Sequence, residues 1–275
     1  MRRTILFAAL VALLASSAVS ALAQGTGKST TGDSGTSATV APRSESNLSY
    51  RGRSEDVRPF TAWITDAVIV QGLVVEPFFA LNDYSGPFKG WNLGGQAGFK
   101  AAPDFETGVR WSLDRLSADN GGGSETGLSD LRGYARYRVQ AKNPQVSVGA
   151  SVDLPIGKEE VGAGNFNVDL FGAMRYHLDS GVVLLANAGI ESVEFGGDNR
   201  DTGIHFGGGA LYPLSRDLSA IGELNWGSAS EYGLINGGLD YLVSGSNHLR
   251  ASLGFGIDNG APDLTLLLGF LMGID

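Results

Sequence analysis

The sequence predicts an all-β fold, a transmembrane antiparallel up-and-down β-barrel of twelve strands, and three observations lead to this prediction. Past residue 70, apolar and polar residues alternate along one segment after another. The connections between these segments are mostly short and long in turn. The chain also combines 41 glycines with only 18% charged residues, which is unusual for a helical protein. An even number of alternating segments, with short turns at one end and longer loops at the other, is typical of a transmembrane β-barrel.

The alternation is clearest in the last segment and in the middle of the chain. In residues 263–274 every even position carries a large apolar side chain, whereas positions 269 and 273 are glycine. In residues 165–178 the even positions are mostly apolar, and most odd positions carry Asn, Asp, Arg or His. Because successive side chains of a strand point to opposite faces, each such segment has one apolar and one polar face.

Twelve segments of this kind follow one another along the chain. We expect strands near 72–81, 91–100, 105–116, 129–140, 145–156, 165–178, 182–194, 203–214, 218–227, 233–244, 248–258 and 263–274. Short turns are expected at 101–104, 141–144, 179–181, 215–217 and 245–247, and longer loops at 82–90, 117–128, 157–164 and 195–202. The connections at 228–232 and 259–262 are shorter than the other loops.

A soluble barrel or a two-sheet sandwich with the apolar faces inside is the alternative fold. A barrel of this size has a lumen too wide for side chains to fill, so an apolar interior would be a void. A sandwich avoids this objection. The polar faces mix charges with glycines, however, and that composition suits a wet lumen better than the surface of a soluble protein.

Aromatic residues support the membrane interpretation. Four tyrosines and one phenylalanine stand on the apolar faces near the short-turn ends of the even-numbered segments, at Phe99, Tyr137, Tyr176, Tyr212 and Tyr241. Trp91 and Trp226 stand near the long-loop end. Aromatic rings at the depth of the lipid headgroups form such girdles.

The N-terminal region predicts export. Arg2 and Arg3 precede a short apolar run, and Ala21-Leu22-Ala23 is typical of a cleavage site, so we interpret residues 1–23 as a signal peptide. Residues 24–58, rich in Gly, Ser and Thr, are expected to form a disordered periplasmic tail. Residues 59–275 are then the barrel of a protein in the outer membrane of a Gram-negative bacterium, with residues 59–71 as a possible N-terminal plug.

Composition excludes several classes of function. The chain has no cysteine, which excludes a disulfide scaffold, a thiolate metal site and a cysteine nucleophile. Twenty basic residues stand against 29 acidic ones, so nucleic acid is not an expected partner. The expected partners are outer-membrane lipid and a small-molecule solute, and the oligomeric state stays open.

The polar faces supply the candidate site. We predict that charged side chains line the pore at Arg110, Arg132, Arg136, Asp153, Asp169, Arg175, Glu191, Glu223 and Asp240. Rings or ladders of charge tune permeation through a pore. Alternatively, these residues pair within the wall and stiffen it, as Arg132 with Asp153 or Asp169 with a basic neighbour.

We predict no catalytic residue, no metal site and no cofactor. The chain has three histidines, and all are expected to face the lumen. His177 and His248 fall near the short-turn end, whereas His205 falls near the long-loop end, so they cannot form one site. A hydrolase at the barrel mouth, with His205 and a carboxylate such as Asp201, is a further alternative.

Several motifs resemble those of the MetA-pathway of phenol degradation family. They are Gly127-Leu128-Ser129-Asp130-Leu131-Arg132 with Tyr134-Ala135-Arg136-Tyr137-Arg138, then Asp153-Leu154-Pro155-Ile156-Gly157, Leu185-Ala186-Asn187-Ala188-Gly189 and Asn259-Gly260-Ala261-Pro262-Asp263. Ile156 stands where the family usually has Thr. The resemblance covers residues 60–275 and implies an outer-membrane channel for aromatic or other small hydrophobic compounds, without catalytic residues or cofactor.

Two functions from different classes follow. The first is a channel for passive diffusion of small solutes, with aromatic or hydrophobic compounds as candidates. The alternative is a closed structural or surface-interaction barrel without transport activity, whose lumen is filled by wall pairs and by residues 59–71. Phe60, Trp63, Ile64 and Val68 are the apolar side chains that would fill it.

Overall fold

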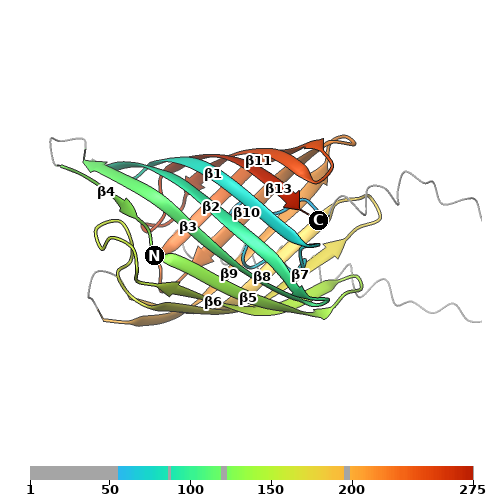
Figure 1. Ribbon diagram of the computed structural model, residues 1–275, viewed down its shortest axis with the longest axis horizontal. Coiled ribbons are helices and arrows are strands. Elements are labelled where there is room, and N and C mark those ends of the chain that lie inside the picture. Colours follow the sequence, from blue (N-terminus) through green and yellow to red (C-terminus); the bar gives the residue numbers. More distant parts are fainter. Residues whose placement is uncertain (1–54, 86–87, 119–122, 195–198, 275) are drawn as a thin grey trace, which may run out of the picture. The chain divides into compact units, whose positions relative to one another are not determined.

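In the computed structural model, which describes residues 55–85, 88–118, 123–194 and 199–274, thirteen strands form one antiparallel sheet that closes on itself (Figure 1). The strands are β1 (Leu73–Asp83), β2 (Phe88–Ala102), β3 (Phe105–Ala118), β4 (Ser124–Leu128), β5 (Leu131–Gln140), β6 (Gln145–Leu154), β7 (Asn167–His177), β8 (Val183–Val193), β9 (Asp201–Pro213), β10 (Leu218–Gly227), β11 (Tyr232–Ser244), β12 (Asn247–Gly256) and β13 (Leu264–Ile274). Pairing of β1 with β13 closes the sheet, with Leu73 opposite Ile274.

The barrel has twelve strand positions, which confirms the predicted fold. The short β4 pairs with residues 113–117 of β3, toward the long-loop end, and β5 pairs with residues 105–110 of the same strand. β4 and β5 therefore together occupy one strand position. The expectation of a loop over residues 117–128 was wrong, because β3 extends to Ala118 and β4 lies within this stretch. The sequence Ser124-Glu125-Thr126-Gly127 lacks an apolar face, and therefore gave no alternating signal.

Ser129 and Asp130 interrupt the strand between β4 and β5. The Ser129 hydroxyl accepts a hydrogen bond from the Ser112 backbone N–H at 3.0 Å. The Asp130 carboxylate accepts hydrogen bonds from the backbone N–H groups of Gly157, Ala163 and Gly164 at 2.8–3.1 Å. These bonds fold the β6–β7 loop back against the interrupted strand at the long-loop end of the barrel.

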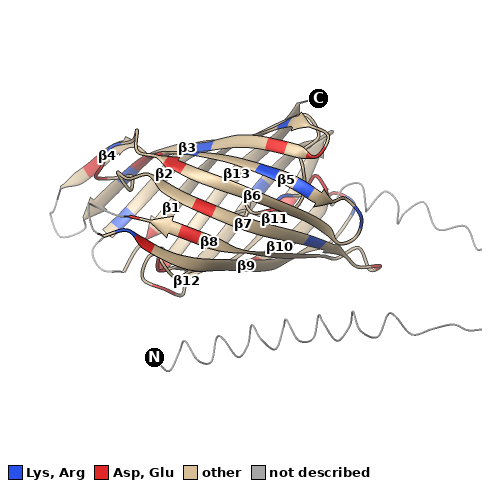
Figure 2. Cartoon of the chain, turned by 90° about the horizontal axis from the view of Figure 1, so that it is seen from below, with Lys and Arg blue, Asp and Glu red and all other residues tan. Residues whose placement is uncertain are grey.

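The outward face of the barrel is apolar. On β11, Ile235, Leu239 and Tyr241 are exposed, whereas Asn236 and Asp240 between them are buried inside. Figure 2 shows charged positions along the strands as well as in the loops, and the alternation turns most of the strand charges inward. Closure through β1 and β13 gives each described strand except the short β4 a partner on both sides, so their backbone hydrogen bonds are satisfied within the barrel, as hydrocarbon surroundings require.

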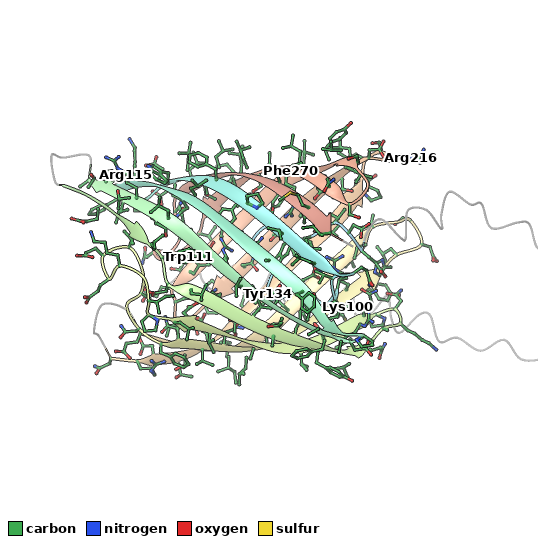
Figure 3. The ribbon with its side chains drawn as sticks, in the orientation of Figure 1. Lys100, Trp111, Arg115, Tyr134, Arg216 and Phe270 are labelled. Carbon is green, nitrogen blue, oxygen red and sulfur yellow. The ribbon has the colours of Figure 1, made fainter. Side chains whose placement is uncertain are left out.

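The short-turn end of the barrel matches the expected girdle. Phe99, Tyr137, Tyr212 and Tyr241 are about half exposed on the outward face near the short-turn end, and Tyr176 is partly buried there. In Figure 3, Lys100 and Arg216 lie at this end, and Arg115 lies toward the other. Among the described residues, the structure has no helix long and apolar enough to cross a membrane.

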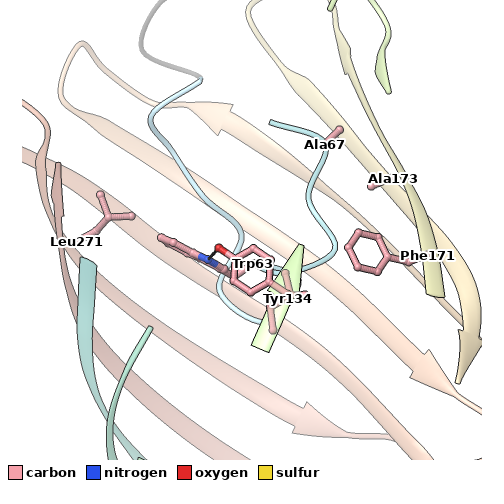
Figure 4. Close-up of a cluster of buried hydrophobic side chains, with 7 residues drawn as sticks. Trp63, Ala67, Tyr134, Phe171, Ala173 and Leu271 are labelled. Carbon is pink, nitrogen blue, oxygen red and sulfur yellow. Dashed lines mark hydrogen bonds between the residues drawn. The ribbon is translucent and has the colours of Figure 1, made fainter. Parts of the chain in front are cut away.

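The segment that precedes β1 runs inside the barrel. We call residues 55–71 the inner segment. Its residues from Val57 to Val70 are largely buried, and Trp63 has no exposed surface. Trp63, Ile64 and Ala67 pack against wall residues that include Tyr134 and Phe171 (Figure 4). A second cluster joins Val57 and Phe60 to the wall residues Val183, Leu211 and Ile221. The apolar core therefore lies between the inner segment and the wall.

Burial of the chain begins before residue 59, which is the predicted start of the barrel. Val57 and Arg58 are already buried. The predicted signal peptide and residues 24–54 of the predicted tail lie outside the described residues.

A charge on the outward face tests the membrane orientation of the strands. We expect Leu239→Arg, in the middle of β11, to lower the free energy of unfolding in lipid vesicles by about 2–4 kcal/mol, because the guanidinium would lie in hydrocarbon. The matched control is Val243→Arg, on the same face near the short-turn end, with an expected loss of about 0–1 kcal/mol. Equal losses from both substitutions, measured by urea titration, would contradict the orientation.

Candidate functional site

A carboxylate between two guanidinium groups fixes the inner segment. Asp66 lies in this segment and is buried. Arg175 on β7 donates from Nε to Asp66 Oδ1 at 2.6 Å and from Nη2 to Asp66 Oδ2. Arg58, also in the inner segment, donates to Asp66 Oδ2 at 3.3 Å and to the Val68 carbonyl at 2.9 Å. The Asp66 carboxylate thus connects two parts of the inner segment to each other and to the wall through hydrogen bonds.

The electrostatics keep Asp66 ionised. Burial by itself raises the pKa of Asp66, but the guanidinium groups of Arg175 and Arg58 outweigh it and hold the pKa below its usual range. A buried charge without such partners would be costly.

Wall side chains also bond to the backbone of the inner segment. Arg136 Nη1 donates to the carbonyls of Trp63 at 2.8 Å and Asp66 at 3.1 Å. Arg175 Nη2 donates to the Val57 carbonyl at 2.9 Å, and Arg250 donates to the Arg58 carbonyl. Irregular backbone at membrane depth needs partners of this kind, because it has no regular ladder of its own.

Two glutamates complement the arginines by accepting from N–H groups of the inner segment. Glu223 on β10 accepts from the backbone of Phe60, from Thr61 at 3.0 Å and from Ala62 at 3.2 Å. Glu106 on β3 accepts from the Val70 backbone at 2.7 Å. Arginines of the wall therefore donate hydrogen bonds to backbone carbonyls of the inner segment, and glutamates of the wall accept hydrogen bonds from its backbone N–H groups.

The charged wall residues also pair with one another. Arg136 lies 2.5 Å from Glu106, which also accepts from the Tyr134 hydroxyl at 2.8 Å. The Trp63 indole donates to that hydroxyl at 3.1 Å (Figure 4).

A second group of paired charges lies around Arg250. Arg250 contacts Glu76 at 2.6 Å and Asp240 at 3.0 Å. Asp240 also lies 2.5 Å from His248 Nδ1.

Toward the long loops, the lumen opens into a cavity of about 560 Å³, which we call the vestibule. Thr61 and Thr65 of the inner segment form part of its wall. Its charged lining residues are Arg110, Asp130, Arg132, Asp153, Asp169, Glu191 and His205.

Most of the vestibule charges already have partners. The expected wall pair is present, since Arg132 donates two hydrogen bonds to Asp153 at 2.6 and 2.7 Å. Asp169 lies 2.6 Å from His205 Nε2. Glu191 accepts from the backbone N–H groups of Ala229 and Ser230 at 2.9 Å, and so holds the β10–β11 turn.

The structure divides the nine predicted site residues into two groups. Arg110, Arg132, Asp153, Asp169 and Glu191 line the vestibule. Arg136, Arg175 and Glu223 hold the inner segment, and Asp240 supports Arg250, which also does so. The nine predicted residues do not include Arg58 and Asp66 of the inner segment or the wall residues Glu76, Glu106 and Arg250. Strand alternation places the last three on inward faces, whereas Arg58 and Asp66 precede the first strand and no alternation marks them.

The histidines lie apart, with His205 in the vestibule and His248 buried beside Asp240. Among the described residues, no group of three or more His, Asp or Glu could hold a metal ion.

Comparisons with known proteins agree with this architecture. The family model described as "Putative MetA-pathway of phenol degradation" matches residues 30–272. No curated protein matches the sequence. An outer-membrane channel from Pseudomonas putida F1 is similar with a TM-score of 0.59 and 15% identity, over 78% of this chain and 98% of that one.

Two porins show the same fold. The KdgM porin has a TM-score of 0.55 and 12% identity, over 74% of this chain and 99% of its own. The NanC porin has a TM-score of 0.51 and 9% identity, over 74% of this chain and 100% of its own. The chain thus has the fold of the outer-membrane β-barrels to which it is similar, as predicted.

Loss of the Asp66 charge is expected to loosen the inner segment. Asp66→Asn leaves Arg175 and Arg58 without their shared anion, so the free energy of docking should fall by about 3–5 kcal/mol. In planar bilayers, the variant should open more often than the wild type. Asp104→Asn, which removes the partly exposed partner of Arg138, is the control and should change docking by less than about 1 kcal/mol. Identical gating of both variants would show that Asp66 does not hold the segment.

The lowered pKa of Asp66 predicts a pH dependence. Because the docked pKa lies below the free value, the contribution of Asp66 is complete above the free value of about 3.9 and is lost as the pH falls through the docked pKa. The difference in open probability between wild type and Asp66→Asn should be constant from pH 7 to 5 and should shrink below about pH 4. A difference that shrinks already between pH 7 and 5 would contradict this assignment.

Proposed function

Because the chain belongs to the MetA-pathway of phenol degradation family, we propose that it is an outer-membrane channel through which small solutes diffuse passively, aromatic or other small hydrophobic compounds among them. The observation that carries the proposal is the vestibule, a polar cavity inside a barrel with an apolar outward face. A barrel that served only as a membrane anchor would not need such a cavity. No catalytic step is part of the proposal.

The dimensions of the vestibule suit a small organic molecule. Its volume of about 560 Å³ lies within the range of about 300–1,000 Å³ that is usual for small-molecule sites. Threonine hydroxyls from the inner segment and the Tyr232 side chain add hydrogen-bonding groups to the charged lining. A phenol would find both polar partners and ring-sized space there.

The inner segment is the barrier in this proposal. A solute that leaves the vestibule toward the short turns meets the segment and its ion pairs. The polar contacts can be replaced by water in the lumen when the segment moves, because charged groups lose less when water solvates them than when they are left dry. The apolar contacts of Trp63 and Phe60 with the wall must open as well, and they add to the cost of displacement.

The alternative is a closed structural barrel, and one observation favours it. The side chains of Asp66, Arg136, Arg175 and Arg250 are almost completely buried, so the inner segment fits the wall closely. If the segment never moves, the vestibule is a surface pocket and no solute crosses.

A reducible crosslink distinguishes the two functions. Thr61 Oγ1 of the inner segment lies 2.6 Å from Asn225 Nδ2 on β10, and the chain has no cysteine of its own. Thr61→Cys with Asn225→Cys, joined by a short bis-methanethiosulfonate crosslinker that forms a disulfide with each cysteine, should lower phenol permeation into liposomes at least about tenfold, and reduction should restore it. Each single cysteine variant, treated with the same reagent, is the control.

The outcomes separate the hypotheses. Reversible loss of permeation supports a channel gated by the inner segment. Permeation that the crosslink leaves unchanged means that solutes pass a static segment. No permeation of phenol or of a small sugar in any state, with insertion demonstrated, would overturn the channel and favour the closed barrel.

A further inference from the structure

Arg110 on β3 differs from the other cations of the vestibule. Arg132 is paired with Asp153, and His205 with Asp169. Within the described ranges, Arg110 has neither an ion pair nor a hydrogen bond, and its contact is with an aromatic ring. We propose that Arg110 is an anion subsite of the vestibule and binds the carboxylate of a small organic monoacid. The binding stands on this geometry, and its consequence for transport rests on the proposed channel function.

The sheet register places a second cation beside Arg110. Arg110 and Arg132 are direct partners in the pairing of β3 with β5. Like charges directly opposite each other are unfavourable in a sheet. Asp153 forms two hydrogen bonds with Arg132 and so compensates only one of the two charges. An anion on Arg110 would compensate the other.

The carboxylates of the vestibule are engaged elsewhere. Asp130 accepts from three backbone N–H groups of the β6–β7 loop, and Glu191 accepts from the β10–β11 turn. Asp169 faces His205. None of these side chains forms an ion pair with Arg110 in the part of the chain that the structure describes, so the guanidinium is available to a ligand.

A ring beneath Arg110 orients it. The Arg110 guanidinium carbon lies 5.0 Å from the centre of the Phe78 ring, a distance suited to a cation–π contact. A Cβ at Gly94 would lie 2.6 Å from Phe78 Cζ, so Gly94 leaves the space that this ring occupies. The guanidinium thus lies over the ring, and its N–H groups, whose fork geometry suits a carboxylate, form no hydrogen bond with the described residues.

The surrounding charges favour a monoanion over a dianion. Four carboxylates line the same vestibule and would repel a second negative charge on the ligand. Glu76 and Asp114 also act on Arg110 electrostatically. Glu76 is engaged by Arg250 and Gln96, whereas Asp114, four residues along β3, lies on the same inward face. Asp114 should therefore weaken anion binding.

Ligand binding to the full-length protein in detergent micelles tests the subsite. Benzoate is the probe and phenol its neutral analogue, with dissociation constants measured by ligand-detected NMR. Arg110→Gln should weaken benzoate binding about tenfold or more and leave phenol binding unchanged, because only benzoate uses the charge. Arg110→Lys should restore part of the benzoate affinity. The matched control is Arg115→Gln, on the same strand with its side chain directed outward to Ser124.

A second variant, which is expected to strengthen benzoate binding, completes the test. Asp114→Asn should strengthen benzoate binding by about two- to threefold, because it removes a negative charge near Arg110. Benzoate affinity that is equal in wild type and Arg110→Gln would overturn the subsite. Equal loss of benzoate and phenol in Arg110→Gln would assign Arg110 a structural role and also overturn it. Competition by chloride as effective as by benzoate would overturn the assignment to organic acids.

Failure of the subsite and failure of the channel can be told apart. If benzoate binding depends on Arg110 but neither benzoate nor phenol enters liposomes, the subsite stands and the channel function fails. If phenol permeates and benzoate affinity does not depend on Arg110, the channel function stands and the subsite fails.

Discussion

The contact of Asp66 with Arg175 and Arg58 is the interaction on which the interior of this barrel depends. An irregular stretch of chain inside a membrane barrel has no ladder for its N–H and C=O groups, so side chains of the wall and of the segment itself must supply the partners. The contact of Asp66 with Arg175 sets the position of the inner segment relative to the wall. Once it lies against Arg175, the carbonyls of Trp63 and Asp66 reach Arg136, and the amides near Thr61 reach Glu223. The apolar side chains of Trp63 and Phe60 then pack against apolar residues of the wall.

This arrangement gives the lumen two regions with different chemistry. In the region of the inner segment, charges are buried in pairs, and each pair is stable only while both members stay in place. In the vestibule, charges are partly solvated, and a ligand can compete for them. The same residue type therefore has different roles at different depths. Arg175 holds a segment of the chain, whereas Arg110, which contacts a ring and no carboxylate among the described residues, is available to a solute.

The sequence predicts the barrel well because a membrane barrel imposes a simple rule on each residue of a strand. Ile235, Leu239 and Tyr241 meet lipid, and Asn236 and Asp240 meet the lumen, so alternation alone gives the strand and its orientation. The inner segment follows no such rule. Its apolar residues Phe60, Trp63 and Ile64 suggested that it could enter the barrel, but its partners in the wall lie far along the chain, 36 positions for Val70 and Glu106 and 70 for Asp66 and Arg136. Which inward charges meet is set by strand register and barrel closure, and these become visible only in three dimensions.

The partners of the inner segment are distributed around the barrel, on β3, β5, β7, β10 and β12. These strands face one another across a lumen only after β1 has met β13. The inner segment precedes β1 to β13 in the chain, yet its complete set of partners exists only in the closed barrel. Docking of the segment is therefore coupled to closure, and a defect in the pairing of β1 with β13 would be felt by the contents of the lumen as well as by the wall.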